Sequence, residues 1–325
     1  MPRLRRSEPS GPGIQRLKAG RGFTYRGADG GPVDAATRER IAALVIPPAW
    51  TEVWICPFPN GHIQATGRDA AGRTQYLYHE AWRLQKDRVK FDRMLELAAS
   101  LPSARRRVTR DLRGDDPKLR TLAAAFRMLD AGSLRVGSDR YAELHGSHGL
   151  STLLCSHVVV SGDTVRLEFP GKSGQEWMSE LDDADLAAAL RPLKRRGPSA
   201  RLLAYKPASS EEAAGWHPVT AEDINDYVRA RTGGEFTAKD FRTLTGTVTA
   251  ACSLARSGSQ PNKTARARAV RAAVSDTAEL LGNTLAVARG SYIDPRLIDA
   301  FEDGRTIDRD RLDSAETQLR ELLAE

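Results

Sequence analysis

The sequence predicts a two-domain α+β protein: a small β-rich N-terminal domain, then a mainly α-helical domain that contains a small antiparallel sheet. Short runs rich in β-branched and aromatic residues alternate with turns in the first 79 residues. Apolar residues recur at helical spacing over most of the remaining chain. One clear hairpin pattern interrupts them at residues 157–177. We place the domain boundary at residue 90, which gives domains of residues 1–90 and 91–325.

The N-terminal domain is predicted to contain one short helix and three strands. Residues 1–20 are rich in Arg, Pro, Gly and Ser, a composition typical of disorder. The helix is expected over residues 37–44. The strands are expected over residues 53–56, 62–66 and 73–79, with turn residues between them.

The third strand carries side chains suited to a nucleic-acid groove. Strand alternation places Tyr76 and Tyr78 on one face and Gln75 and Leu77 on the other. With Arg73, these side chains offer the amide, guanidinium and aromatic groups that bind base edges and phosphates. Tyrosines that simply pack on a small sheet would give the same pattern, so both interpretations stay open.

The C-terminal domain is predicted to be helical around one hairpin. Helices are expected over residues 80–101, 119–132, 182–193, 220–228, 237–248, 265–281 and 309–324. Lys172 lies at the hairpin tip, in a Gly-Lys-Ser sequence. This is no phosphate-binding P-loop, because the upstream glycine is missing and strands flank it on both sides, so no nucleotide site is indicated.

Two arginines of this domain stand among apolar neighbours. Arg135 follows the helix that ends at residue 132, and Arg242 lies beside the apolar stripe of the helix that starts near residue 237. An arginine so placed is partly buried and needs a partner. Arg135 is therefore either part of a structural salt bridge or a phosphate clamp.

Composition and charge narrow the classes of function. The net charge of +7 and the isoelectric point near 9.5 favour a polyanionic partner, because neutralising phosphates releases their counterions. A genome rich in G and C would also raise the arginine content. The sequence shows no apolar run long enough for a membrane span, no pattern of a secretory leader and no cysteine spacing typical of a metal site. These observations predict a cytoplasmic protein that neither enters a membrane nor binds a metal.

Five short motifs follow one another in the chain, ending at a tyrosine in a small-residue segment. Alone, that tyrosine would be an ordinary packing residue. The motifs are Leu134-Arg135-Val136-Gly137, Gly171-Lys172, Lys239-Asp240-Phe241-Arg242, Leu281-Gly282-Asn283-Thr284 and Gly290-Ser291-Tyr292. Their order resembles the type IB DNA topoisomerases, above all the small poxvirus-like enzymes of some bacteria. Residues 46–50 and 72–78 are similar to the N-terminal domain of that family.

The resemblance implies a role for each motif. Tyr292 would attack a DNA phosphodiester and form a 3′-phosphotyrosyl link. Arg135 and Arg242 would stabilise the transition state, since a guanidinium stays charged and bridges two phosphoryl oxygens. Lys172 would protonate the leaving 5′-oxygen, with help from Arg135. Asn283 stands where much of the family has histidine, and its amide can donate a hydrogen bond without carrying charge.

By the same resemblance, we expect the protein to relax positive and negative supercoils without ATP, metal or any other cofactor. We expect a monomer that clamps duplex DNA in the nucleoid, with DNA contacts from the third strand and from Tyr141 and Lys239.

Two alternatives remain. A tyrosine recombinase shares the active-site logic, but typically has histidine at the place of Lys239, and the β-rich N-terminus favours the topoisomerase. A non-catalytic basic DNA-binding protein would explain the charge but not the ordered motifs.

Overall fold

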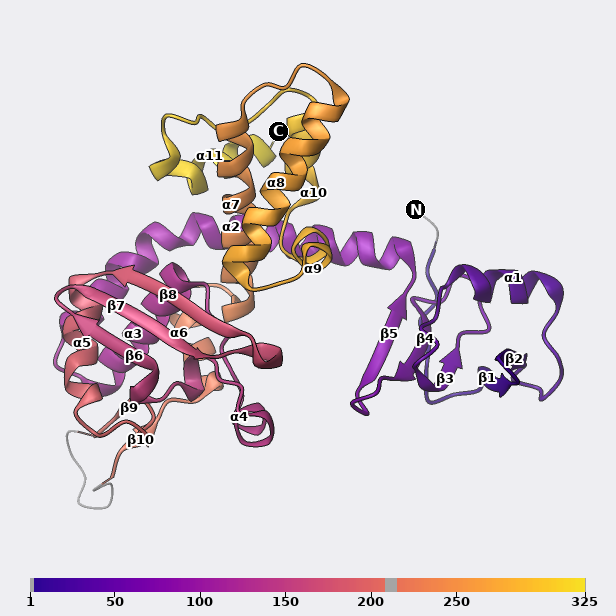
Figure 1. The fold of residues 1–325 in the computed structure, drawn as a ribbon, viewed down its shortest axis with the longest axis horizontal. Coiled ribbons are helices and arrows are strands. Elements are labelled where there is room, and N and C mark those ends of the chain that lie inside the picture. Colours follow the sequence, from indigo (N-terminus) through magenta and orange to yellow (C-terminus); the bar gives the residue numbers. More distant parts are fainter. Residues whose placement is uncertain (1–2, 208–214, 325) are drawn as a thin grey trace. The chain divides into compact units, whose positions relative to one another are not determined.

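The computed structural model describes residues 3–207 and 215–324. The chain divides into two compact units, Met1–Lys90 and Phe91–Glu325 (Figure 1). The β-rich first unit and the mainly helical second unit, with its small sheet, confirm the predicted fold class.

The first unit is built on a five-stranded antiparallel sheet in the order β2-β1-β3-β4-β5 (Figure 1). Its elements are β1 (Ile14–Ala19), β2 (Gly22–Arg26), α1 (Ala35–Ala43), β3 (Thr51–Ile55), β4 (Ile63–Arg68) and β5 (Thr74–Tyr78). Helix α1 begins at Asp34, whose carboxylate accepts the Thr37 N–H, and it buries Ile41 in the core under the sheet. The helix and the three strands predicted from sequence are all present.

The disorder predicted for residues 1–20 is wrong for residues 3–20, because this segment adds strand β1 to the sheet, while residues 1 and 2 lie outside the described residues. Ile14 is a buried core residue, and β1 pairs with both β2 and β3. Upstream, the indole nitrogen of Trp54 donates to the Gly11 carbonyl at 3.1 Å. A Cβ at Gly13 would lie 2.0 Å from that indole nitrogen, so glycine is required for the close approach. The composition of residues 1–20, rich in Gly and Arg, gave no indication of these long-range contacts.

The second unit contains the predicted helices and hairpin, together with short elements that the sequence did not predict. Its helices are α2 (Glu80–Arg113, shared with the end of the first unit), α3 (Pro117–Gly132), α4 (Asp139–His145), α5 (Ala184–Lys194), α6 (Ala221–Thr232), α7 (Ala238–Ser257), α8 (Lys263–Leu281), α9 (Leu285–Ser291), α10 (Pro295–Glu302) and α11 (Ala315–Ala324). Its strands are β6 (Val158–Ser161), β7 (Thr164–Pro170) and β8 (Glu176–Asp182), in that order in one antiparallel sheet, and the short pair β9 (Ala204–Tyr205) and β10 (His217–Pro218).

Helix α2 is longer than the sequence predicted. The expected helix ends at residue 101, but the structure continues through Pro102 to Arg113. Leu101, Ala104 and Val108 are fully buried, so one apolar stripe runs across the proline. Tertiary packing of this stripe outweighs the missing backbone donor of Pro102.

The core of the second unit joins α3 to the helix that carries Arg242. The Phe126 ring of α3 meets the Phe241 ring of α7 edge to face, with centroids 5.2 Å apart. Helices α3 and α5 also pack against the β6-β7-β8 sheet (Figure 1). The end of α3 and the start of α7 are thereby held together, which places Arg135 near Arg242.

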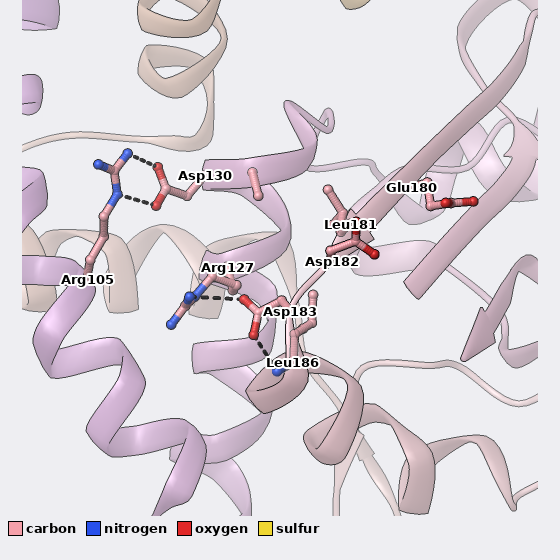
Figure 2. A pocket seen from close by; sticks show the side chains of 9 residues that line it. Arg105, Arg127, Asp130, Glu180, Leu181, Asp182, Asp183 and Leu186 are labelled. Atoms are coloured by element: carbon pink, nitrogen blue, oxygen red, sulfur yellow. Dashed lines mark hydrogen bonds and ion pairs between the residues drawn. The ribbon is translucent and has the colours of Figure 1, made fainter. Parts of the chain in front are cut away.

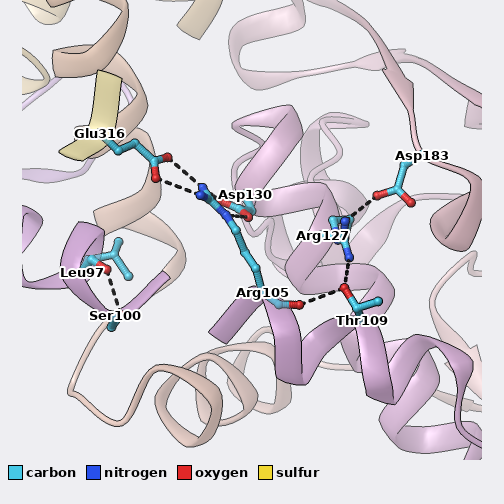
Figure 3. Close-up of polar contacts among 8 residues, drawn as sticks. All are labelled: Leu97, Ser100, Arg105, Thr109, Arg127, Asp130, Asp183 and Glu316. Carbon is cyan, nitrogen blue, oxygen red and sulfur yellow. Dashed lines mark hydrogen bonds and ion pairs between the residues drawn. The ribbon is translucent and has the colours of Figure 1, made fainter. Parts of the chain in front are cut away.

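An arginine on α2 ties the C-terminal helix to α3. Arg105 forms paired hydrogen bonds with Asp130 of α3 and with Glu316 of α11, at 2.7–2.8 Å (Figure 3). Hydrogen bonding to Asp130, opposed by partial burial and supported by Glu316, raises the pKa of Arg105. A pocket of about 430 Å³ lies beside this ion-pair network, and Figure 2 shows the carboxylates Asp130, Glu180, Asp182 and Asp183 around it.

Candidate active site

Arg242 forms the centre of a cluster that also contains Tyr292. Its side chain is buried in the first turns of α7, and residue 242 is only 3% exposed. Nη1 donates to the Ser133 carbonyl at 2.5 Å, and Nη2 donates to the Leu281 carbonyl at 2.7 Å. The guanidinium carbon lies 5.3 Å from the Tyr292 ring centroid. Burial lowers the pKa of Arg242, partly opposed by the nearby phenol of Tyr292.

Arg135 reaches the same cluster from the loop after α3. Its Nη2 donates to Asn283 Oδ1 at 2.7 Å and to the Gly282 carbonyl at 3.3 Å. The Arg135 main chain is held in turn, because its carbonyl accepts from the Leu150 N–H at 2.9 Å. Burial, together with the positive charge of Arg242, lowers the pKa of Arg135 to about 10.

Asn283 follows the C-cap of α8, where Gly282 takes a left-handed conformation with φ of +55°. Its Oδ1 accepts from Arg135, which fixes the orientation of the amide. Its Nδ2 is buried and has no hydrogen-bond partner among the residues that the structure describes. The Nε of Arg242 is also buried without a hydrogen-bond partner among these residues. The cluster therefore contains two buried donors that an added oxygen-rich ligand could satisfy.

Tyr292 ends the short helix α9 and is partly buried. Burial of the phenol opposes its ionisation, but the nearby Arg242, Arg135 and Lys239 outweigh it and lower the pKa of Tyr292. Lys239 itself is exposed in the first turn of α7. A lowered pKa means that a larger fraction of this phenol is ionised at neutral pH than of an ordinary tyrosine.

The structure does not bring Lys172 into this cluster. Lys172 is exposed at the turn between β7 and β8, as the sequence predicts, and within the described residues no hydrogen bond or ion pair joins it to the other four. Trp177 from the same hairpin does reach the cluster: its ring centroid lies 6.0 Å from the Arg242 guanidinium carbon. A Cβ on Gly282 would lie 3.3 Å from the same indole.

Trp177 and the Ser133 carbonyl are the site components that sequence reasoning missed. Trp177 stacks on Phe169, its partner in the strand register, with centroids 6.4 Å apart. An aromatic residue directly opposite another on a hairpin was the available signal. A backbone carbonyl has no such signal, because every residue has one.

The candidate DNA-contacting residues of the first unit fall into two sets. Tyr76 and Tyr78 are 45% and 41% exposed, and their rings stack with centroids 5.9 Å apart, on one face as predicted. Gln75 lies on the other face, and both it and Arg73 donate to Asp69 at 2.9 Å. Hydrogen bonds from Arg73, and lesser ones from Gln75, lower the pKa of Asp69 to about 2.

Tyr141, the remaining candidate, projects from α4, a helix without buried residues. Its side chain is 45% exposed, and its ring lies 5.6 Å from that of His145.

The described residues contain no group of three or more His, Cys, Asp or Glu side chains that could hold a metal ion. Across residues 3–207 and 215–324, no helix combines the length and apolar character needed to cross a membrane. The pocket beside Arg105 shares no residue with the Arg242 cluster.

Comparison with known proteins places the whole arrangement in one family. Residues 79–307 match the family model described as the catalytic core of eukaryotic DNA topoisomerase I, and residues 22–69 match the N-terminal domain of bacterial DNA topoisomerase IB. A DNA topoisomerase 1B of Acanthamoeba polyphaga mimivirus is 33% identical over 289 residues, covering 86% of this chain and 85% of that protein. A DNA topoisomerase 1 of Mycosarcoma maydis is 25% identical over 194 residues, covering 55% of this chain and 19% of that longer protein. The chain therefore belongs to the type IB DNA topoisomerase family, and it is an isomerase that acts on DNA.

Proposed function

We propose that the protein relaxes positively and negatively supercoiled duplex DNA by cutting one strand, holding it as a 3′-phosphotyrosyl ester, and resealing it. The observation that carries this proposal is a tyrosine beside two largely buried arginines that no carboxylate neutralises. Within the described residues, Arg135 and Arg242 donate to carbonyl oxygens of the backbone and of Asn283, and Arg242 also interacts with the Tyr292 phenol. None of these partners is a carboxylate. Buried charge without a counter-ion is costly, so the site favours an anion such as a phosphodiester.

The chemistry follows from the positions of these groups. The Tyr292 oxygen forms a bond to phosphorus while the bond from phosphorus to the 5′-oxygen breaks. Arg135 and Arg242 stabilise the charge on the phosphoryl oxygens as the pentacoordinate transition state forms. The phenol proton passes to solvent water, and its loss is favoured because the surrounding cations lower the pKa of Tyr292. Religation is the reverse, with the 5′-hydroxyl as nucleophile, so the ester bond conserves the energy and neither ATP nor a metal is needed.

Lys172 is proposed to give its proton to the departing 5′-oxygen, assisted by Arg135. Its exposed place at a hairpin tip is compatible with closure of the hairpin onto bound DNA. Trp177 and Arg242 would remain the inner contact of that hairpin with the site. General acid catalysis of this kind contributes a factor of about 10²–10⁴ in rate.

Asn283 is proposed to donate its free Nδ2 to a non-bridging phosphoryl oxygen. The bond from Arg135 occupies Oδ1, and the amide nitrogen is buried without a partner among the described residues. A neutral donor stabilises the developing charge less than a protonated histidine would, so the contribution of Asn283 is modest.

DNA binding is proposed to use both units as a clamp around the duplex, by a protein that acts as a monomer in the nucleoid. Tyr76 and Tyr78 supply exposed aromatic rings in the first unit, while Tyr141 and Lys239 supply contacts in the second. Gln75 and Arg73 would first exchange their hydrogen bonds with Asp69 for bonds to DNA. Once one strand is cut, superhelical torsion drives the swivel.

Relaxation of plasmids tests the proposal directly. Wild-type protein should relax both positive and negative supercoils in EDTA without ATP, and denaturation with detergent should trap protein on the 3′ end of the cut strand. Tyr292→Phe should bind DNA but neither relax nor trap it. Retained relaxation by Tyr292→Phe would disprove the assignment of the nucleophile. Synapsis at a defined repeat would indicate a recombinase, and DNA binding without any covalent adduct would indicate a non-catalytic protein.

A further inference from the structure

The main chain of Tyr292 packs against one turn of α7, formed by the uncharged residues Gly246 and Thr247. Thr247 is fully buried, and its Oγ1 lies 3.0 Å from two carbonyl oxygens, that of Tyr292 and that of Thr243 four residues earlier, which share its one proton. The same Oγ1 accepts from the N–H of Asp294 at 3.3 Å. One hydroxyl thus bonds to the main chain on both sides of Ile293, a core residue that is 2% exposed.

Gly246, the preceding residue of α7, lets the tyrosine backbone come this close. A Cβ at position 246 would lie 2.8 Å from the Tyr292 carbonyl oxygen and 2.9 Å from the Tyr292 Cβ. Neither atom can give way cheaply, because the first belongs to the backbone and the second is the root of the side chain. Any residue larger than glycine at position 246 must therefore change the spacing between α7 and the main chain of Tyr292.

The segment before Tyr292 offers little support of this kind. In α9, Ala288 is the only buried residue, and Leu285 and Val287 are 52% and 43% exposed. The segment after it is fixed: Asp294 is fully buried, and its carboxylate accepts three bonds from the Arg296 guanidinium at 2.7–3.1 Å. The tyrosine is thus anchored mainly by α7 and by the residues that follow it.

We infer that Gly246 and Thr247 are positioning residues for the nucleophile, an inference that rests on the proposed function of Tyr292. Arg242 lies one turn earlier on the same helix, so α7 fixes both the tyrosine main chain and the guanidinium that faces the phosphate. The spacing between these two groups then stays the same whether the phenol is free or esterified. Misplacement by about 1 Å can reduce a rate by about 100-fold, so this anchor should matter for cleavage and for religation alike.

The matched variants are Thr247→Val, which keeps the shape and removes the hydroxyl, and Thr247→Ser, which restores it. Thr121→Val is the control: Thr121 is likewise a buried threonine that donates to the carbonyl four residues earlier, Pro117, at 2.8 Å, but it lies on α3 without contact to the site. Gly246→Ala is an independent second variant, which pushes on the same backbone.

Two readouts separate positioning from simple loss of stability. In single-turnover reactions, Thr247→Val and Gly246→Ala should slow cleavage and religation by about 10- to 100-fold with unchanged DNA Kd, and Thr247→Ser should recover to within a few-fold of wild type. In DNA-free protein labelled with 3-fluorotyrosine, the ¹⁹F resonance that Tyr292→Phe removes should shift or broaden in Thr247→Val and return in Thr247→Ser. Thr121→Val should alter neither readout beyond the effect of any fall in Tm.

Each outcome decides between the claims. Wild-type rates and an unmoved resonance in Thr247→Val would overturn the positioning role while leaving the proposed function intact. Equal losses in Thr121→Val and Thr247→Val would reduce the effect to general stability and overturn it as well. If wild type forms no covalent adduct but the resonance responds as expected, the anchor stands and the proposed function fails.

Discussion

The main-chain carbonyl of Ser133 accepts a 2.5 Å hydrogen bond from Nη1 of Arg242. Ser133 is buried at the C-cap of α3 and adopts a left-handed conformation with φ of +51°, which a residue with a Cβ takes only at a cost of about 1–2 kcal/mol. This strained turn directs its carbonyl toward the arginine. Strain of this kind persists where the surrounding structure fixes it, and here it lies within the candidate active site.

Substitution of Ser133 should separate strain from function. Ser133→Gly keeps the carbonyl and removes the Cβ penalty, so we expect the free energy of unfolding to rise by up to about 1 kcal/mol with relaxation preserved. Ser133→Val should destabilise the protein and slow relaxation, because a β-branched residue is least compatible with this conformation. Urea unfolding and plasmid relaxation measure the two effects. A Ser133→Val variant as active and stable as wild type would contradict the role of the turn.

Lys172→Ala should cleave ordinary DNA about 100-fold or more slowly, since the leaving 5′-oxygen then lacks its acid. The rate should recover when that oxygen is replaced by sulfur, because a thiolate leaves without a proton. The measurement is single-turnover cleavage of matched duplexes with oxygen or sulfur at the bridging position. Arg242→Lys is the comparison, because loss of transition-state stabilisation is not repaired by sulfur. Failure of sulfur to restore Lys172→Ala would argue against the general-acid role.

The lowered pKa of Tyr292 predicts a pH dependence for cleavage. Because cations stabilise the phenolate, the rate should rise with pH and level off below pH 10, the ordinary pKa of tyrosine. Removing one of these cations raises the pKa again, so in Lys239→Gln the plateau should begin at a higher pH. Lys118→Gln, on α3 and ion-paired with Asp223, should leave the profile unchanged. Identical profiles for wild type and Lys239→Gln would show that Lys239 does not tune the phenol.

Because position 283 is asparagine and not histidine, the pH dependence of the cleavage rate should show no limb near the pKa of histidine. Asn283→Ala removes a donor and leaves Arg135 without its 2.7 Å acceptor, so we expect cleavage to slow by about 10-fold, a loss near 1.4 kcal/mol. Asn283→His should add a new limb near the pKa of histidine, with little change in maximal rate. A large gain in the maximal rate of Asn283→His would show that asparagine is not optimal at this position.

His157 predicts a loss of stability in mild acid. Burial, together with the nearby His148, lowers the pKa of His157 to about 4 from its ordinary 6.5. Between pH 4 and pH 6.5, His157 is protonated in the unfolded chain but stays neutral in the folded protein. The stabilising contribution is therefore complete above pH 6.5 and is lost as the pH falls toward 4. In His157→Asn, Tm should fall less between pH 7 and pH 5 than in wild type. An equal fall in both proteins would place the acid sensitivity elsewhere.

Much of the site could be predicted from sequence, because its charged and aromatic side chains stand in recognisable local patterns. The apolar neighbours of Arg135 and Arg242 predicted that both side chains are partly buried, and both are found in one cluster. The turn sequence around Lys172 predicted a hairpin tip, and β7 and β8 confirm it. The alternation of the third strand predicted the shared face of Tyr76 and Tyr78.

The remainder depends on contacts that leave no local pattern. The carbonyls of Ser133 and Leu281 hold Arg242, but a carbonyl belongs to every residue. From sequence alone, Gly246 would be a destabilising residue inside a helix, but the structure shows that the Tyr292 backbone packs directly against it. Pro102 reads as a helix end, yet a buried stripe carries α2 through it. In each case long-range packing outweighs the local preference that sequence patterns report.

The position of Trp177 gives the molecule an optical reporter. Its indole stacks on Phe169 of the hairpin and also lies 6.0 Å from the guanidinium carbon of Arg242, so a change in either neighbour would alter the emission of the ring. The chain has four other tryptophans, and with these replaced by phenylalanine, fluorescence would report on the arrival of a phosphate or the closing of the hairpin in real time. A stopped-flow trace on Tyr292→Phe would then time the assembly of the site before any bond to DNA is broken.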